Sequence, residues 1–522
     1  MVAKAEKVFT NDSVLCLEVV TNPTGEILPH HLKQINAVGK RLSEINQPKK
    51  IEIVNTKYFK AGIFALVVLI AINCRNTRQQ RFGASEEGET SKVVLPTARQ
   101  VEWADAEIGV LIHFDINVFE PGYNWWQAWD YNPDPKIFNP AELNTDQWIK
   151  TAKDAGANYA VLVAKHCTGF SLWPTEAHDY SVESSSWRNG EGDIVADFVA
   201  SCKKYGIKPG IYASAAANGY FKVANPGLVI TGDSIAQEAY NKVVETQLTE
   251  LWSNYGDLFE IWFDGGVLPK SKGGPDIVPI LRERQPDAIV FQGPYGTKNL
   301  VRWVGNEEGL AAYPCWATAD STTKADGTVV VEGLHGNPDA PIWCPGEADA
   351  PLRKNSSWEG GWFWKEGQDD MINSRSEMIH KYYNSVGRNT NLLIGVVVDT
   401  RGLVPDADVK ALKAFGDEIK RRFDTSLAET HAEGSEVVLK FDAPAKINHV
   451  VIMEEITKGE RIRKYKVEGM VNGVWELLTQ GESVGHKRIQ QFEPVEVSSL
   501  RLSIPEAIAL PKIKKLAAYY IE

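Results

Sequence analysis

The chain has 522 residues, of which 43% are hydrophobic and 24% charged. This balance is that of an ordinary globular protein, and the length allows two or three domains with substantial cores. The formal net charge of -12 argues against a nucleic-acid surface, because phosphate binding needs clustered Lys and Arg. The 16 Trp residues favour a neutral ligand such as a sugar, whose apolar faces pack on indole rings.

An apolar run at residues 61–72 has the length of an export-signal core, and Lys57 and Lys60 precede it. The polar stretch 75–91 follows Cys74. This pattern resembles a bacterial lipoprotein signal, in which Cys74 would carry the lipid and residues 75–91 would form a tether to the membrane. We therefore expect residues 1–91 to be a leader and tether, and the protein to be an exported periplasmic or outer-membrane lipoprotein of a bacterium.

Two features of the leader depart from such a signal. Asn73 is larger than the small residue usual before a lipidated cysteine, and the apolar run begins only at residue 61. The alternative is a buried helix or strand of a small N-terminal domain, since the run is too short to span a bilayer as a helix. The six cysteines show no paired spacing, so neither a disulfide framework nor a zinc cluster is predicted.

Short apolar segments alternate with amphipathic ones from about residue 94 onward. Strands are expected at 107–114, 158–165, 208–213, 258–263, 288–291, 301–304, 342–344 and 392–397. Helices are expected at 146–155, 193–205, 234–255 and 406–422. Strands that are apolar throughout are typical of parallel sheets covered by helices. Eight of them predict a (β/α)8-like barrel, which we place at residues 92–428.

The last part of the chain has a different rhythm, in which apolar and polar residues alternate. Strands are expected at 435–441, 448–453, 464–469 and 500–504. This spacing predicts a C-terminal β-sandwich at residues 429–522.

The strand at 258–263 ends in two aromatic residues and delivers Asp264 onto the turn formed by Gly265 and Gly266. A carboxylate beside aromatic walls at the C-terminal end of a buried strand is well placed to contact a ligand. The alternative is an Asp that caps a glycine turn, which is a common structural role.

Catalytic groups of a (β/α) barrel come from the C-terminal ends of several strands. The residues at these ends are His113, Lys165, His166, Tyr212, Ser214, Asp264, Arg302, Glu307, Glu308, Glu347, Asp349 and Asn391. Carboxyl groups together with imidazoles, a phenol and many indoles fit glycoside hydrolysis better than acyl or phosphoryl transfer. No spacing typical of a metal site is present, so no metal is predicted.

Several motifs carry a resemblance to a known family. They are IGVLIHF at 108–114, FNP at 138–140, DQW at 146–148, AKHCTGFSLW at 164–173, WVGNEE at 303–308 and SVGRNTNLL at 385–393. With them the chain resembles glycoside hydrolase family 29, the α-L-fucosidases, over about residues 94–522. The resemblance implies a (β/α) barrel followed by a galactose-binding-like β-sandwich. It also implies a retaining exo-glycosidase that releases terminal α-L-fucose from oligosaccharides or glycoconjugates without a cofactor.

The resemblance also implies roles for individual residues. The nucleophile maps onto Asp264, and the branch with a Gly-Asn-Glu motif places the general acid/base at Glu307, with Glu308 and Glu347 as alternatives. The residues expected to bind substrate are His113, Trp126, His166, Tyr212, Trp262, Arg302 and Trp364.

One position departs from the family pattern. Most members have two adjacent histidines followed by Asp-Gly-Phe, whereas this chain has His166, Cys167 and Thr168 before Gly-Phe. A thiol is a weak hydrogen-bonding group, and losing a contact to a sugar hydroxyl costs about 0.5–1.5 kcal/mol. A galactosidase-type activity on a related terminal sugar is therefore an alternative. A non-catalytic glycan-binding surface lipoprotein is another.

Overall fold

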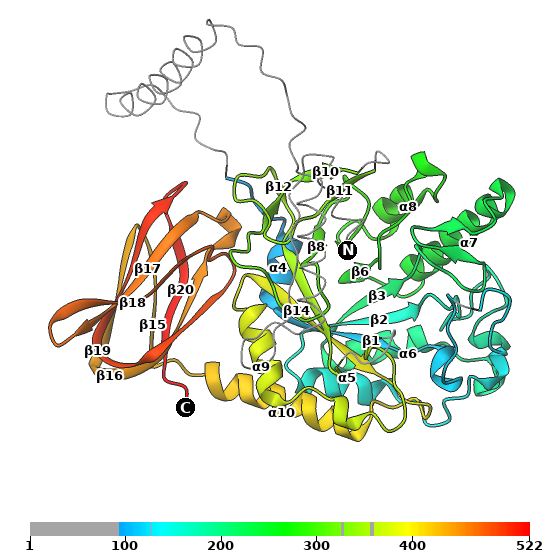
Figure 1. Cartoon of the computed structure of the whole chain (residues 1–522), viewed down its shortest axis with the longest axis horizontal. Helices are drawn as coiled ribbons and strands as arrows, with labels where there is room; N and C mark the ends of the chain where they lie inside the picture. Colours follow the sequence, from blue (N-terminus) through cyan, green and yellow to red (C-terminus); the bar gives the residue numbers. More distant parts are fainter. Residues whose placement is uncertain (1–92, 127, 325–327, 355–359) are drawn as a thin grey trace, which may run out of the picture. The chain divides into compact units, whose positions relative to one another are not determined.

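The computed structural model describes residues 93–126, 128–324, 328–354 and 360–522. Figure 1 shows a barrel of strands with helices around it, and a sheet that forms the C-terminal part of the chain. The barrel is closed, with neighbouring strands in the order β1-β14-β13-β8-β7-β6-β3-β2, and all pairs are parallel. Its strands are β1 (Ile108–His113), β2 (Tyr159–Lys165), β3 (Lys208–Ala213), β6 (Glu260–Trp262), β7 (Ile289–Phe291), β8 (Leu300–Trp303), β13 (Gly346–Pro351) and β14 (Thr390–Val397).

The two faces of each barrel strand explain why the strands are apolar throughout. In β1, Val110 and Ile112 pack in the layer between strands and helices, while Leu111 points into the barrel. Tyr159 fills the interior next to Gly109, where a Cβ atom would lie 2.3 Å from the tyrosine ring. The interior is therefore a packed core, and a ligand can enter only at an end of the barrel.

Helices cover the outside of the barrel. They are α4 (Ala98–Ala106), α5 (Thr145–Asp154), α6 (Ile194–Tyr205), α7 (Ser234–Ser253), α8 (Ile277–Arg284), α9 (Arg375–Asn384) and α10 (Asp406–Phe423). Their ends follow local sequence signals: the side chain of Asp193 caps the N-terminus of α6, and Gly206 ends that helix in a left-handed conformation. The four predicted helices agree with α5, α6, α7 and α10 to within two residues at each end.

The predicted strand at 342–344 is wrong as a barrel strand. Ile342 and Trp343 form β12 (Ile342–Trp343), which pairs with β9 (Thr318–Ala319) outside the barrel. The barrel strand is β13, which contains Glu347, Asp349 and Pro351 and is buried along its whole length. Two other short pairs lie outside the barrel: β4 (Val223–Ala224) with β5 (Leu228–Val229), and β10 (Ser321–Thr323) with β11 (Val329–Val331).

The C-terminal part is a six-stranded antiparallel sheet in the order β15-β20-β16-β19-β17-β18. Its strands are β15 (Ala428–Glu433), β16 (Glu436–Glu454), β17 (Ile462–Val471), β18 (Val474–Glu482), β19 (Arg488–Ala507) and β20 (Lys512–Tyr519). The long strands β16 and β19 shift register twice along their pairing, and bulges of this kind let a sheet bend over its own core. Val437, Ile447, Val467 and Leu500 belong to this core. The expected fold class, a (β/α)8-like barrel followed by a C-terminal β domain, is confirmed, and the strands of the predicted β-sandwich are linked in one antiparallel sheet.

Hydrogen bonds join the C-terminal sheet to the barrel domain. The carboxylate of Glu460 accepts from the backbone amide of Ala317 at 2.9 Å, and His486 contacts Glu107 at 3.1 Å. Lys487 pairs with the same Glu107. Burial raises the pKa of that glutamate, but the charge of Lys487 and the hydrogen bonds from His486 and Lys487 lower it to about 2. The contacts favour a structural role for the C-terminal sheet.

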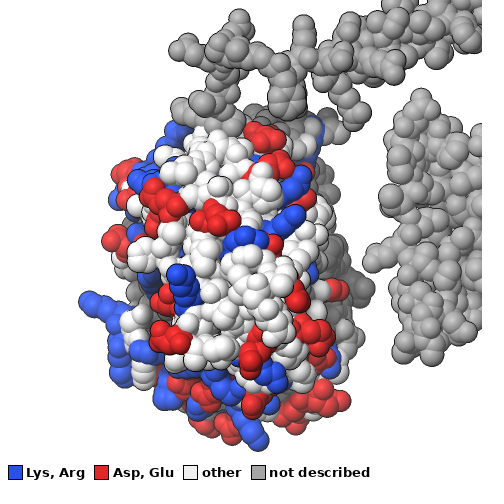
Figure 2. Space-filling view, turned by 90° about the vertical axis from the view of Figure 1, so that its left-hand side faces the viewer, with Lys and Arg blue, Asp and Glu red and all other residues white. Residues whose placement is uncertain are grey.

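Acidic and basic side chains are interspersed on the face shown in Figure 2. Within the part of the chain that the structure describes, no helix combines the length and apolarity needed to cross a membrane. The predicted signal at residues 61–72 and the predicted lipidation site at Cys74 lie outside the described residues.

Candidate active site

A cavity of about 250 Å³ opens where the barrel strands end. Such a position is where barrel enzymes bind their substrates. Its lining is aromatic and acidic and consists of Leu111, His113, Trp125, Trp126, His166, Cys167, Tyr212, Trp262, Asp264, Glu307, Asp349, Gly360, Trp362 and Phe363. Most of these residues lie at or just beyond the C-terminal ends of β1, β2, β3, β6, β8 and β13.

Asp264 reaches the cavity because of the turn that follows β6. Phe263 is fully buried and anchors the strand end, and the next two glycines adopt φ values of 71° and 79°, which favour glycine. The carboxylate of Asp264 accepts a hydrogen bond of 3.1 Å from the hydroxyl of Tyr212. The surrounding walls limit hydration of this carboxylate and raise its pKa, and Glu307 adds to the rise, while the Tyr212 hydrogen bond opposes it.

A stack of rings supports Asp264 from inside the barrel. Trp262 lies parallel to Phe291 with ring centroids 4.0 Å apart, and Tyr212 stacks on Trp262 at 5.4 Å. The indole of Trp262 donates a hydrogen bond of 2.8 Å to Glu347. Because each ring is fixed by a neighbour, the phenol of Tyr212 is held in position before any substrate binds.

Glu307 reaches the same cavity from the loop after β8. The side chain of Asn306 shapes this loop, since its oxygen accepts from the backbone amide of Glu308 and its nitrogen donates to the carbonyl of Leu310. The carboxylate of Glu307 accepts a hydrogen bond of 3.0 Å from the indole of Trp362. Glu308 points away and lies outside the cavity, in a groove beside Lys381. Of the two adjacent glutamates, only Glu307 shares the cavity with Asp264.

A third carboxyl group, Asp349, also lines the cavity. It is buried and accepts a hydrogen bond of 2.6 Å from the indole of Trp303. Burial raises its pKa well above the usual value, and the charge of Glu307 raises it further. Asp349 was among the residues expected at a strand end, but sequence reasoning gave it no role.

Two imidazoles face the cavity opposite the carboxylates. His113 and His166 have ring centroids 6.0 Å apart, and Phe363 packs against both. Burial lowers the pKa of His113 to about 3 and that of His166 to about 4. Both rings are therefore neutral near pH 7, and a neutral imidazole offers one donor and one acceptor to a hydroxyl-rich ligand.

The indole of Trp126 lies at the rim of the cavity. Its side chain is exposed, and it stacks on Trp125 with ring centroids 4.9 Å apart. Trp125 itself is buried and also lines the cavity.

Three residues expected in the site lie elsewhere. Arg302 is buried behind the strands, where its guanidinium donates to the backbone carbonyls of residues 333, 344 and 316 and holds their loops together. Glu347 is buried beneath the cavity and accepts from Trp262 and Tyr159. Trp364 packs against the outer core, and its neighbours Trp362 and Phe363 line the cavity in its place.

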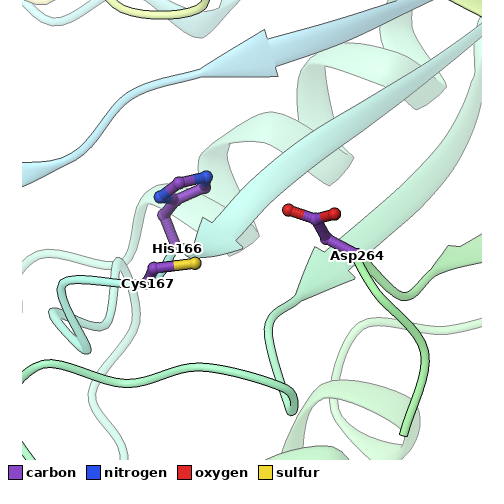
Figure 3. A group of neighbouring side chains, drawn as sticks. All are labelled: His166, Cys167 and Asp264. Atoms are coloured by element: carbon purple, nitrogen blue, oxygen red, sulfur yellow. The ribbon is translucent and has the colours of Figure 1, made fainter. Parts of the chain in front are cut away.

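Among the described residues, one group of side chains has donor atoms placed to hold a metal ion, although the sequence predicted no metal site. The group consists of His166, Cys167 and Asp264, whose donor atoms all lie within 4.8 Å of one another. Figure 3 shows the imidazole and the thiol at the end of β2, opposite the carboxylate at the end of β6.

Comparisons with known proteins agree with the geometry. Residues 76–422 match the family model described as Alpha-L-fucosidase. Alpha-L-fucosidase 1 of Arabidopsis thaliana is 31% identical over 475 residues, which cover 81% of this chain and 87% of that protein. A crystal structure of a Bacteroides thetaiotaomicron VPI-5482 protein assigned as an α-L-fucosidase is 38% identical, with a TM-score of 0.78, and the match covers 83% of this chain and 100% of that one.

A glycoside hydrolase 29 family member from an unknown rumen bacterium has a similar fold. It is 27% identical with a TM-score of 0.70, and the match covers 82% of this chain and 78% of that one. The match to the family model and the extent of the likeness to the Arabidopsis protein lead to one conclusion: this chain is a glycoside hydrolase and belongs to the α-L-fucosidase family, glycoside hydrolase family 29.

Proposed function

We propose that this protein is a retaining exo-α-L-fucosidase in which Asp264 is the nucleophile and Glu307 the general acid/base. The observation that carries the proposal is the meeting of these two carboxyl groups in one cavity, in a chain of this family. A cavity of about 250 Å³ is smaller than the range of about 300–1,000 Å³ that holds drug-sized ligands. It therefore suits a single terminal sugar of a fucosylated oligosaccharide or glycoconjugate.

In the first step, Asp264 attacks the anomeric carbon of the bound fucose while Glu307 gives its proton to the departing glycosidic oxygen. The bond to the aglycone breaks, and an ester between the sugar and Asp264 forms. The indole of Trp362 occupies one carboxylate oxygen of Glu307, Oε2. The proton to be transferred therefore sits on the other oxygen, Oε1.

In the second step, the same glutamate acts as a base. Esterification removes the negative charge of Asp264, and Glu307 has by then lost its proton to the departing aglycone. Glu307 then takes a proton from water, the water oxygen attacks the anomeric carbon, and Asp264 leaves as a carboxylate. Two inversions at the anomeric carbon give net retention.

Neutral imidazoles and indoles supply the binding contacts. His113 and His166 are placed to hydrogen-bond sugar hydroxyls, and Trp362 and Phe363 offer flat apolar faces. Trp262 also lines the cavity, but Tyr212 and Phe291 stack on its ring. A pocket built this way recognises a neutral sugar.

The activity is tested with aryl α-L-fucoside and aryl β-D-galactoside side by side, with Asp264→Ala as the control. We expect the fucoside to be hydrolysed with the higher kcat/KM and the variant to be inactive but folded. A higher kcat/KM for the galactoside would mean that Cys167 has shifted the specificity. Sugar binding without turnover of either substrate would identify a glycan-binding protein.

We propose further that the protein is an exported lipoprotein anchored through Cys74. The apolar run at 61–72 between lysines and a polar spacer supports this proposal. In a bacterial host, the protein should fractionate with membranes and carry acyl chains on Cys74, and Cys74→Ser should release it into the soluble fraction. An unmodified Cys74 in the mature protein would contradict the proposal.

A further inference from the structure

Three side chains in the cavity have donor atoms that form few hydrogen bonds with other described residues. The sulfur of Cys167 has one polar neighbour, the hydroxyl of Ser214 at 3.8 Å. The carboxylate of Asp264 accepts from Tyr212 through Oδ2 only. Across residues 93–126, 128–324, 328–354 and 360–522, no hydrogen bond reaches the imidazole of His166. Nitrogen, sulfur and oxygen donor atoms thus lie within 4.8 Å of one another, brought together from the ends of β2 and β6, which flank β3 in the barrel (Figure 3).

The cavity around this point offers carboxyl groups and no cationic lining residue. Three carboxyl groups, Asp264, Glu307 and Asp349, line the cavity, and no Lys or Arg is among the lining residues that the structure describes. Lys165, which directly precedes the cluster in the chain, is turned elsewhere and donates to Gln247 at 2.9 Å. The negative charge that attracts a cation here is that of Asp264, because burial raises the pKa of Asp349 well above its usual value.

The distances fit a tetrahedral ion after small side-chain rotations. Zinc bonds of about 2.0–2.3 Å imply donor atoms roughly 3.3–3.6 Å apart, whereas these donors lie within 4.8 Å of one another. Rotation about the side-chain bonds of His166 and Asp264 closes such a gap without moving the strands.

We propose that His166, Cys167 and Asp264 form a binding site for a thiophilic divalent cation of the Zn²⁺ type, and that an ion bound there blocks glycoside hydrolysis. The mixed set of imidazole, thiolate and carboxylate suits Zn²⁺ and not the oxygen-binding Mg²⁺ or Ca²⁺. On binding, Cys167 releases its thiol proton to solvent and the sulfur becomes the ligand. The ion binds the carboxylate of Asp264 where the anomeric carbon of the sugar would otherwise lie. Metal and sugar therefore exclude each other.

The site itself does not depend on the activity, but the blocking effect rests on the proposed function. Binding is therefore measured first without substrate. Protein stripped with a chelator is titrated with Co²⁺, and the near-ultraviolet charge-transfer band of a cobalt thiolate is recorded. We expect one Co²⁺ per chain and a band that Zn²⁺ displaces and Mg²⁺ does not.

Variants locate the ligands. Cys167→Ser and Cys167→Ala should each abolish the band and weaken Zn²⁺ binding at least tenfold, and either one suffices if the other fails to fold. Asp264→Asn should weaken binding but keep the band. Cys202→Ala is the matched control, because that cysteine is buried in α6 and should leave both readouts unchanged. A band that persists without Cys167, or a Zn²⁺ affinity in the Cys167 variants equal to that of the wild type, would overturn the site.

Inhibition is then measured with aryl α-L-fucoside. Zn²⁺ should raise the apparent KM in the concentration range that fills the site, and Cys167→Ser should need at least tenfold more Zn²⁺ for the same effect. Inhibition that is equal in both proteins would overturn the blocking effect. A cobalt band in a protein that does not hydrolyse fucosides would refute the proposed function and leave the metal site standing.

Discussion

The hydroxyl of Tyr212 donates a hydrogen bond of 3.1 Å to Oδ2 of Asp264. Tyr212 is buried and stacked on Trp262, so the donor is fixed before substrate arrives. The hydrogen bond lowers the pKa of Asp264 against the rise caused by burial. It therefore keeps the carboxylate ionised for attack and stabilises it again when the ester is cleaved.

Replacing Tyr212 by Phe should lower kcat without unfolding the protein. A hydrogen bond to a charged group contributes about 1.5–3 kcal/mol, which corresponds to roughly 10–100-fold in rate. Because the pKa of Asp264 rises when the donor is lost, the acidic limb of the kcat/KM profile should move to higher pH. Tyr240→Phe, which removes a buried hydroxyl bonded to a backbone carbonyl outside the cavity, is the control. An unshifted acidic limb in Tyr212→Phe would argue against Asp264 as the ionised group.

Replacing Glu307 by Ala should affect substrates according to their leaving group. General acid catalysis contributes about 10²–10⁴-fold, and natural glycans need it while activated aryl fucosides do not. Glu307→Ala should therefore lose far more activity on a fucosylated oligosaccharide than on an aryl fucoside with a good leaving group, and azide should partly restore turnover. Glu308→Ala is the matched control, because its side chain lies outside the cavity. The selective pattern in Glu308→Ala would move the acid/base role by one residue.

The ion pair between Arg353 and Asp408 should be important for stability. Both side chains are buried, and the guanidinium donates to Asp408 at 3.0 and 2.5 Å. Among the described residues, Asp408→Ala leaves the buried guanidinium with the exposed Asp369 as its one acidic partner, and the change should cost about 3–5 kcal/mol in the free energy of unfolding. Asp154→Ala, which removes an exposed partner of Lys150, should cost less than about 1 kcal/mol. Chemical denaturation of both variants checks the contrast, and similar losses would contradict it.

Asp115 should make stability depend on pH. Burial raises its pKa to about 7, although hydrogen bonds from Thr168 and from the backbone of Ile116 oppose the rise. In the unfolded chain the pKa is about 3.9. The folded protein therefore binds the Asp115 proton more tightly than the unfolded chain does, and protonation stabilises the fold. This contribution is complete below about pH 4 and is lost as the pH rises to about 7.

Asp115→Asn removes this titration and keeps the contacts to Thr168. Raising the pH from 4 to 8 should therefore lower the free energy of unfolding of the wild type, relative to that of the variant, by on the order of 3 kcal/mol. Thermal melts of both proteins across this range give the comparison. Parallel curves would show that Asp115 is ionised in the fold.

Much of the fold could be predicted because barrel strands buried on both faces are apolar throughout. Seven of the eight barrel strands overlap the expected segments. The exception, β13, carries two carboxyl groups in its interior, at Glu347 and Asp349, and reads as a polar loop. Indole donors from Trp262 and Trp303 satisfy these groups, and such partners come from distant parts of the chain. Sequence periodicity does not contain that information.

The site could be predicted in part, because the apolar barrel strands show which residues lie at their C-terminal ends. Asp264 and Glu307 follow strands that were expected, and the structure brings both into one cavity. Arg302 also belongs to an expected strand, but its side chain points behind the sheet to backbone carbonyls. A strand end shows which residues are near the rim, whereas the direction of each side chain depends on packing. The cluster of His166, Cys167 and Asp264 was not predicted, because its members come from two strands and have no spacing typical of a metal site.

The most direct test of the account is to trap the glycosyl-enzyme. The protein is incubated with a 2-fluoro-fucosyl fluoride, which slows cleavage of the ester more than its formation, and the labelled peptide is identified by mass spectrometry. We predict one fluorofucosyl group per chain, attached to Asp264, with activity lost in proportion to labelling. A label on a different carboxylate, or turnover of aryl fucoside with inverted stereochemistry and no label, would contradict Asp264 as the nucleophile of a retaining fucosidase.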